Sequence, residues 1–296
     1  MNTNPINFDL KNADPKKAED RLNEVAHRLS KAIASDDLRL YYQPVINVKN
    51  GELNSLETLC RWNDLELNTV TPDEFIAVAE ARGLIIALGS VVLQQVIRDL
   101  PSILKRWPTI RIAINVSSIE LEQEGFAKNI IASINESNAN FANHFELEIS
   151  ESISTLNLPK VQSHLEKLKH AGISIALDDF TTANSNLGRL HTLPFDKIKL
   201  DRTFTHGLDD PLVQTLIKIL VDLTNSENKT MVFEGVENSK QLNTLKRLGC
   251  NLAQGYFLGS PRPLEELDEM RINNEAFMKK QEEERVYRIL SNQGDF

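Results

Sequence analysis

The chain has 296 residues, of which 41% are hydrophobic and 25% charged, a composition typical of a globular protein with a substantial core. Its formal net charge of −9 argues against binding along a DNA or RNA polymer, because that mode needs clustered Lys and Arg. No basic start precedes an apolar stretch, and no run of about eighteen apolar residues occurs, so we expect no membrane insertion by this segment. Cys60 and Cys250 are too few for a disulfide framework, and we expect two buried thiols in a reducing compartment.

The first predicted elements are one helix and two strands. Residues 1–12 are polar and irregular. A helix is expected over Pro15–Ser35, because a proline stands at its first position and apolar residues recur at helical spacing behind it. Apolar strands are expected at Leu38–Tyr42 and Leu53–Leu59. A lead-in helix is therefore expected to precede the first strands of the domain.

After these elements, apolar strands alternate with amphipathic helices. The expected helices are Pro72–Arg82, Ser90–Leu100, Glu120–Asn135, Pro159–His170, Pro211–Asn225 and Ser239–Leu248. The expected strands are Ile110–Val116, Phe145–Ile149, Ile173–Leu177, Lys197–Leu200, Met231–Phe233 and Leu252–Phe257. Such alternation predicts parallel βαβ units, and eight strands favour a closed barrel over an open sheet.

The chain divides into three predicted parts. Residues 1–28 form an N-terminal segment with the lead-in helix, residues 29–264 form the barrel domain, and residues 265–296 form a charged tail. The tail is expected to be a solvated helix, with docking against a partner as the less favoured alternative.

Six of the predicted strands end on acidic, amide or ammonium side chains. Because a parallel barrel brings the carboxyl ends of its strands to one face, we expect these side chains to share one pocket. Five of them are carboxylates, which repel each other unless cations lie between them. The set is Glu57, Asn115, Glu148, Asp178, Asp179, Lys199 and Glu234.

This oxygen-rich set predicts Mg²⁺ or Mn²⁺ rather than Zn²⁺, because no His or Cys accompanies it. Two such cations would activate a water and neutralise a phosphoryl group. An isolated Asp178-Asp179 pair is more often a helix cap or a solvated turn, so its interpretation as a metal site depends on the other acidic residues of the set. Lys199 is expected to orient a nucleophile or a phosphate oxygen, the alternative being a salt bridge within the acidic cluster. Glu151 is expected to brace a loop.

Eight short motifs occur along the chain: Tyr42-Gln43-Pro44, Glu57-Thr58-Leu59-Cys60-Arg61-Trp62, Asn115-Val116-Ser117, Glu148-Ile149-Ser150-Glu151-Ser152, Asp178-Asp179-Phe180, Lys199-Leu200-Asp201-Arg202, Glu234-Gly235-Val236-Glu237 and Gln254-Gly255-Tyr256. In this order they resemble the motifs of the EAL domain family of bacterial cyclic di-GMP phosphodiesterases. The resemblance covers Leu29 to Pro263. It implies a modified (β/α)₈ TIM-type barrel whose first strand is antiparallel, and the hydrolysis of cyclic di-GMP to linear pGpG. It also implies a cytoplasmic location, alone or within a larger signalling protein.

The resemblance assigns roles to the strand-end residues. The implied metal ligands of a two-metal Mg²⁺ or Mn²⁺ site, at which Ca²⁺ is expected to inhibit, are Glu57, Asn115, Glu148, Asp178, Asp179 and Glu234. Lys199 matches the lysine that touches the attacking water, and Glu234 matches a general base; with Glu57 they form the expected catalytic group. The implied substrate-binding residues are Gln43, Arg61, Gln254 and Asp201. Arg61 is independently suitable, because a guanidinium can fork onto a phosphate.

Two departures from the family pattern stand out. Thr58 replaces the alanine of the family name, a change that keeps Glu57. In the loop after Asp179, Thr181 and Ala183 replace two glycines, and a β-branched residue is strained where φ must be positive. In the family this loop supports metal binding and a homodimer interface, so its alteration at residues 181–186 predicts low activity.

Three functions therefore stay open. The favoured one is a metal-dependent phosphodiesterase, because every implied ligand and the lysine are present. The second is a receptor that binds cyclic di-GMP without cleaving it, as the altered loop would favour. The third is a barrel that serves only as a protein-interaction surface.

Overall fold

The computed structural model of the chain describes residues 15–64, 67, 70–150, 158–180 and 193–268. Glu151, the loop Thr181–Asn186 and most of the charged tail lie outside these residues. Within the described part, no helix has the length and apolar character needed to cross a membrane.

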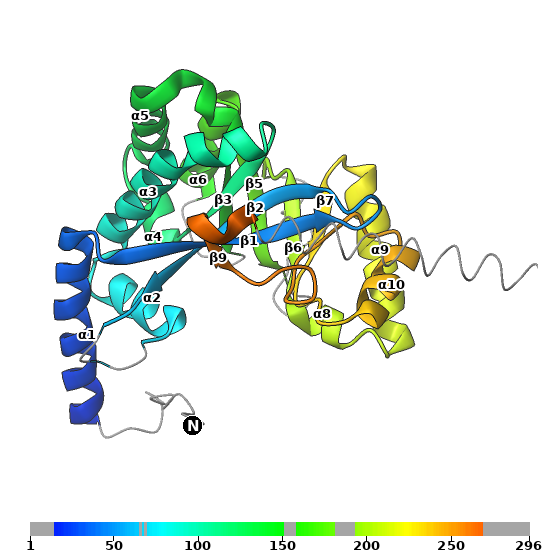
Figure 1. Cartoon of the computed structure of the whole chain (residues 1–296), viewed down its shortest axis with the longest axis horizontal. Helices are drawn as coiled ribbons and strands as arrows, with labels where there is room; N and C mark the ends of the chain where they lie inside the picture. The colour runs from blue at the N-terminus through cyan, green and yellow to red at the C-terminus, as the bar shows by residue number, and fades with distance from the viewer. Residues whose placement is uncertain (1–14, 65–66, 68–69, 151–157, 181–192, 269–296) are drawn as a thin grey trace, which may run out of the picture.

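The centre of the molecule is a closed barrel of eight strands (Figure 1). Strands β2 to β8 follow one another in parallel, whereas β1 runs antiparallel to both β2 and β8 and so closes the barrel. A short strand β9, Arg262–Pro263, adds to the outer part of β1. The barrel strands are β1 Leu38–Asn47, β2 Leu53–Trp62, β3 Arg111–Val116, β4 Phe145–Ser150, β5 Ser174–Phe180, β6 Lys197–Leu200, β7 Thr230–Phe233 and β8 Leu252–Ala253.

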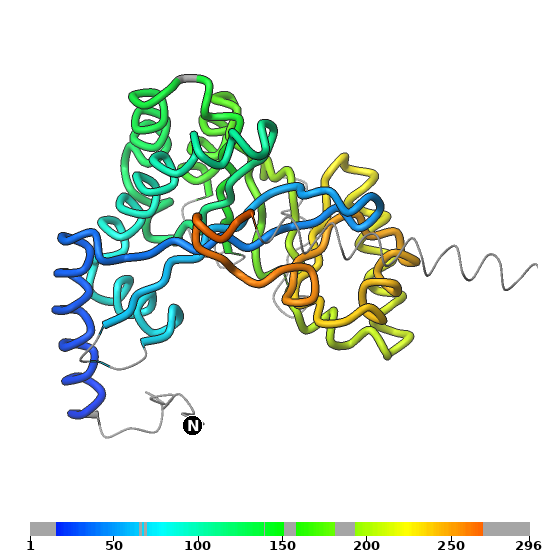
Figure 2. Tube along the Cα trace, viewed as in Figure 1, coloured from blue at the N-terminus to red at the C-terminus, as the bar shows by residue number. Residues whose placement is uncertain are grey.

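This architecture confirms the predicted modified (β/α)₈ barrel with an antiparallel first strand. Figure 2 shows β1 and β2, in blue, running side by side through the middle of the view, with the orange segment of β9 beside them. Gln43 on β1 pairs with Glu57 on β2, a register that places two predicted site residues next to each other.

Helices cover the outside of the barrel (Figure 1). They are α1 Pro15–Ser35, α2 Pro72–Ala81, α3 Ile85–Arg106, α4 Ser118–Leu121, α5 Phe126–Asn138, α6 Leu158–His170, α8 Arg202–His206, α9 Pro211–Ser226 and α10 Ser239–Arg247, with the 3₁₀ turns η1 Ala139–His144 and η3 Leu264–Glu266. Capping residues define where two of these helices begin. Thr71 accepts a backbone N–H at the beginning of α2 and Asp210 does so at the beginning of α9, and each precedes a proline.

Two predicted elements differ from the observed ones at glycines with positive φ. The single helix expected over Glu120–Asn135 is divided into α4 and α5, with Gly125 at φ +78° between them. The strand expected over Leu252–Phe257 ends at Ala253, because the chain turns at Gly255, whose φ is +156°. A Cβ at Gly255 would lie 2.2 Å from the carbonyl oxygen of Val236, so no other residue fits there.

The lead-in helix α1 is part of the folded body. Val25 and Leu29 on its inner face are fully buried in a second apolar cluster with Trp62 and Phe75, whose rings meet edge to face at 6.0 Å. The predicted domain boundary between residues 28 and 29 falls within α1 and stays a prediction.

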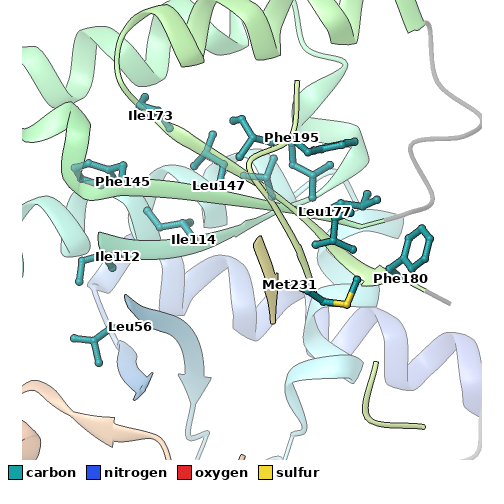
Figure 3. Packing of buried hydrophobic residues seen from close by; sticks show 14 of the residues in the cluster. Leu56, Ile112, Ile114, Phe145, Leu147, Ile173, Leu177, Phe180, Phe195 and Met231 are labelled. Atoms are coloured by element: carbon teal, nitrogen blue, oxygen red, sulfur yellow. The ribbon is translucent and has the colours of Figure 1, made fainter. Parts of the chain in front are cut away.

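The main core lies between the strands and the surrounding helices. Figure 3 shows outward-facing side chains such as Ile112, Phe145 and Leu147 packed in this layer. Cys250 is buried there and Cys60 is only partly buried; both are free thiols, and burial raises the pKa of each to about 12. The inside of the barrel, by contrast, holds buried charged side chains, including Glu57, Glu146, Glu148, Lys197 and Lys199.

Candidate active site

The ammonium group of Lys199 lies at the centre of the predicted acidic cluster. Its Nζ is 2.8 Å from Glu148 Oε2, 2.9 Å from Glu234 Oε1, 3.2 Å from Asp178 Oδ1 and 3.4 Å from Glu57 Oε2. Lys199 is 1% exposed, and the carboxylates come from β2, β4, β5 and the end of β7. The barrel therefore brings together side chains that are distant in the sequence.

Lys199 keeps its positive charge in this position. Burial alone would lower the pKa of an ammonium, but the surrounding carboxylates, Glu148 and Glu57 foremost, raise it well above its usual value. The salt bridges considered as the alternative role of Lys199 are therefore present. They also hold its ammonium rigidly among the predicted ligands, so the two roles are compatible.

Glu57 is held by a second set of contacts on the β1 side of the site. Its Oε1 accepts a hydrogen bond of 3.1 Å from Asn115 Nδ2, and its Oε2 accepts one of 2.5 Å from Gln254 Nε2. Gln254 also donates to Gln43 Oε1 at 3.1 Å, and Gln43 donates to the carbonyl of Gly259. Burial would raise the pKa of Glu57, but Lys199 and these hydrogen bonds hold it below its usual value. Glu57 is therefore a fixed carboxylate.

The other predicted metal ligands form a compact group at the opening. Oxygen atoms of Asp178, Asp179 and Glu234 all lie within 4.8 Å of one another, and Asp179 is exposed while the other two are half-buried. Their oxygen donors suit a hard divalent cation. Glu57 and Glu148 lie outside this group and contact Lys199, and Asn115 contacts Glu57.

Asp178 and Asp179 meet through an irregularity within β5. The strand continues to Phe180, but its pairing with β6 shifts between Leu177 and Phe180, and Asp179 adopts φ +53°. The sequence predicts that the two carboxylates converge where the strand ends, whereas the strand resumes after them. Neighbouring side chains of a regular strand point to opposite sides, so this distortion is what brings both to the cluster.

Burial also acts on the carboxyl groups that face the opening. It raises the pKa of Glu234 to about 7, with Asp178 and Glu57 adding to the rise and Lys199 opposing it. The pKa of Glu148 is raised well above its usual value by burial and by the charge of Glu57. The pKa of Asp179 is raised for similar reasons, burial first and Asp178 second. The cluster therefore favours the uptake of positive charge.

The remaining predicted substrate-binding residues lie nearby on the chain but in different settings. Arg61 is four residues beyond Glu57 on β2, which places it on the same side of the strand; its guanidinium lies 5.9 Å from the ring centre of Tyr41. Asp201 accepts the backbone N–H of Thr203 at 2.9 Å and so caps α8. Tyr41 is not among the residues predicted from the sequence.

A second buried ion pair lies one layer below the cluster. Lys197 Nζ is 2.9 Å from Glu146 Oε2, and it also donates to Asn54 Oδ1 at 3.1 Å. Lys197 and Glu146 precede Lys199 and Glu148 by two residues on the same strands, so all four point into the barrel. This pair was not predicted, although the two-residue spacing of like charges on both strands is a signal that could have revealed it.

The comparison with known families classifies the chain. The family model described as EAL domain matches residues 26–261. The chain belongs to the EAL domain family. The sequence resemblance is therefore confirmed.

Curated relatives of this EAL domain include cyclic di-GMP phosphodiesterases. The chain is 33% identical over 250 residues to cyclic di-GMP phosphodiesterase NbdA of Pseudomonas aeruginosa, covering 83% of this chain and 32% of that protein. It is 32% identical over 236 residues to cyclic di-GMP phosphodiesterase PdeR of Escherichia coli, covering 79% of this chain and 35% of that protein. The chain thus spans about a third of the length of these relatives.

Solved structures of this EAL domain family share the fold. The PaMucR phosphodiesterase in complex with c-di-GMP superposes with a TM-score of 0.75 at 32% identity, covering 82% of this chain and 99% of that one. The FimX EAL domain gives a TM-score of 0.74 at 23% identity, covering 80% of this chain and 96% of that one. The second comparison shows the fold alone.

Proposed function

We propose that this chain is a divalent-metal-dependent phosphodiesterase that hydrolyses cyclic di-GMP to linear pGpG. The observation that carries the proposal is the set of carboxylates around Lys199, to which Glu148, Glu234, Asp178 and Glu57 lie at 2.8–3.4 Å. The names of the relatives NbdA and PdeR support the choice of substrate. The proposed catalytic unit spans residues 29–264, acts in the cytoplasm and forms a homodimer.

The donor set fits the expected metal ions. Asp178, Asp179 and Glu234 offer carboxylate oxygens within 4.8 Å of one another, without any nitrogen or sulfur donor. Asp178 Oδ1 is buried and has no hydrogen-bond partner among the described residues, although the ammonium of Lys199 is 3.2 Å away. We assign Mg²⁺ or Mn²⁺ to this group and to the adjoining Glu57, Asn115 and Glu148. When bound, such ions supply Lewis acidity toward the phosphoryl group, and Ca²⁺ is expected to inhibit.

The protein's own residues have separable roles in this proposal. Glu234 is assigned as the base that accepts the proton of the attacking water. Lys199 orients that water with an ammonium group that four carboxylates hold in place. Arg61 forks onto a phosphate, and Asp201 and Gln43 contact the guanine nucleotides. Gln254 acts by holding Glu57, through its hydrogen bond of 2.5 Å.

The test is hydrolysis by the purified chain with Mg²⁺ or Mn²⁺, followed by chromatography of the products. We expect linear pGpG from the wild type and none from Glu57→Gln or Asp178→Asn, with the circular dichroism of both variants unchanged. Asp209→Asn is the matched control, because Asp209 is an exposed carboxylate paired with Lys240. Turnover that persists after thorough chelation would contradict the metal assignment. Absence of product both with Mg²⁺ and with Mn²⁺ would contradict the proposal that the chain is a hydrolase.

The altered sequence of the loop after Asp179 supports a second candidate, a receptor that binds cyclic di-GMP without cleaving it. This candidate predicts saturable binding in the presence of Ca²⁺ and no product with Mg²⁺ or Mn²⁺. Restoring the family residues by Thr181→Gly, Ala183→Gly and Asn184→Tyr together should then raise turnover and lower the metal concentration for half-maximal activity. Equal rates and equal metal dependence in both proteins would remove the sequence-based reason for this candidate.

A further inference from the structure

A cavity of about 210 Å³ lies outside the barrel, between α3, α5 and the strands β3 and β4. Ile114 and Leu147, which are paired across β3 and β4 (Figure 3), form part of its wall. The space is partly open to solvent, so a small molecule can enter it. Its rim carries Ile86, an exposed large apolar side chain.

The chemistry of the lining is uneven. Most of the wall is apolar, and hydrogen-bonding groups come from Ser90, Gln123, Asn129 and Ser133. Among the described residues that line the cavity, Glu120 is the single charged one, and none is a lysine, arginine or histidine. The occupant that fits is therefore a molecule with an apolar body.

The fold makes room for the carboxylate of Glu120 at this place. Its Oε2 accepts the backbone N–H of Ser117 at 3.0 Å, while its Oε1 lies against Gly89 of α3. A Cβ at Gly89 would lie 1.8 Å from that oxygen, so a larger residue there would force the carboxylate to shift. No salt bridge of Glu120 is formed among the described residues, and the second carboxylate nearby, Glu80, accepts from Ser117 Oγ at 2.5 Å.

The described surroundings of Glu120 thus lack a balancing positive charge. Burial, together with the nearby Glu80, raises the pKa of Glu120 to about 7, which shows how poorly its negative charge is balanced. A cation placed beside it would relieve this imbalance, and the apolar wall would bury a compact hydrocarbon body. The space is too small for a helix, whose diameter with side chains is about 10 Å, so a small molecule is the fitting occupant.

We propose that this cavity binds a small organic cation, namely a primary amine attached to a compact apolar group. The ammonium lies against Glu120, and the apolar group lies between Ile114, Leu147 and Phe126. This site is separate from the acidic cluster, because Ile114 and Leu147 face away from the barrel interior.

The cavity adjoins the acidic cluster through β3. Asn115 contributes to the lining, and its side chain donates to Glu57 at 3.1 Å. A ligand that restrains the end of β3 therefore alters the position of Asn115. This coupling, which rests on the proposed function, is reciprocal: if the amine changes the affinity for Mg²⁺, Mg²⁺ changes the affinity for the amine by the same factor.

The experiment is a titration of the full chain with benzylamine and, as the matched neutral compound, benzyl alcohol. Binding is followed by NMR at the methyl groups of Ile114 and Leu147, without nucleotide, so its outcome is independent of hydrolysis. We expect saturable shifts, with benzylamine bound about tenfold more tightly than the alcohol, as a hydrogen bond to a charged group implies. Glu120→Gln should remove this preference, and Glu124→Gln, a charge change outside the lining, should keep it.

A second variant tests the location without altering the charge. Ser133→Leu fills the cavity from α5 and should weaken the binding of both compounds at least about tenfold. This loss of affinity is expected because the leucine side chain occupies the volume that the apolar group needs. Equal affinities for amine and alcohol in the wild type, or an unchanged preference in Glu120→Gln, would overturn the proposal. Absence of saturable shifts at Ile114 and Leu147 would do the same.

Discussion

Replacing Lys199 by methionine should destabilise the metal-free protein and at the same time abolish turnover. Methionine keeps most of the buried hydrocarbon chain and removes only the ammonium, which lies within 3.4 Å of four carboxylates. Without it, the buried oxygens of Glu57 and Glu148 face each other uncompensated. The variant therefore isolates the charge of Lys199 from its packing.

The expected magnitude follows from the burial of the group. Breaking a buried ion pair by removing one partner costs about 3–5 kcal/mol, and Lys199 is 1% exposed. Protonation of Glu148 and Glu234, whose pKa values are already raised, relieves part of this cost, so we expect the lower end, about 3 kcal/mol. In a domain of this size that corresponds to a decrease in Tm of roughly 6–12 °C.

Lys197→Met is the matched control, because Lys197 is on the same strand, is also buried, and contacts the single carboxylate Glu146 among the described residues. Chemical denaturation with and without Mg²⁺ measures the free energy of unfolding of both variants. We expect Mg²⁺ to restore most of the loss in Lys199→Met, since a divalent cation replaces the missing charge, and little in Lys197→Met. Turnover should be lost in the first and retained in the second.

Two outcomes would refute this reasoning. If Lys199→Met matches the wild type in its metal-free unfolding free energy, the ammonium does not balance the carboxylates. If Mg²⁺ stabilises both variants equally, the cation does not replace the missing charge of Lys199.

Three further outcomes are expected. The folded-state pKa of Glu120 is about 7, above its usual 4.5, so its contribution to the free energy of unfolding is present below pH 4.5 and is lost as the pH rises through 7. In denaturant titrations, the free energy of unfolding of Glu120→Gln should match that of the wild type near pH 5 and exceed it at pH 8 by at most about 3 kcal/mol. Arg61→Lys should raise KM for cyclic di-GMP about tenfold with little change in kcat, as measured by initial rates, because the guanidinium fork is lost; an unchanged KM would contradict the phosphate contact. Gly255→Ala should lower the free energy of unfolding by about 3 kcal/mol and Gly83→Ala by about 1 kcal/mol, because an added Cβ meets the Val236 backbone only at the former; equal losses would disprove the clash.

Strand-end residues were predictable because the period of a strand is simple. Glu57, Glu148 and Lys199 each follow an apolar alternation that fixes which face they occupy, and a closed parallel barrel then places them together. The antiparallel β1 came from the family resemblance rather than from any local pattern. β1 pairs with β2 and β8 because the barrel closes there, and closure depends on the whole chain rather than on a local pattern.

Features that depend on one backbone angle or on packing were not predictable. Asp178 and Asp179 were expected to converge, but the distorted strand that brings them together needs the positive φ of Asp179, which an aspartate tolerates but does not require. The division between α4 and α5 depends on Gly125, which a helical pattern can also accommodate. The cavity beside Glu120 arises from the distance between α3 and α5, and no sequence period encodes such a distance.

The antiparallel first strand also constrains how the protein folds. Ile46 and Asn47 of β1 pair with Ala253 and Leu252 of β8, so the barrel closes only between residues near opposite ends of the domain. Pairing across so long a loop is entropically costly and slow. During synthesis, β1 and β2 can form their long hairpin at once, but its open edge must wait for the last strand to leave the ribosome. A refolding experiment should accordingly show the hairpin protected from hydrogen exchange well before the β1–β8 contact.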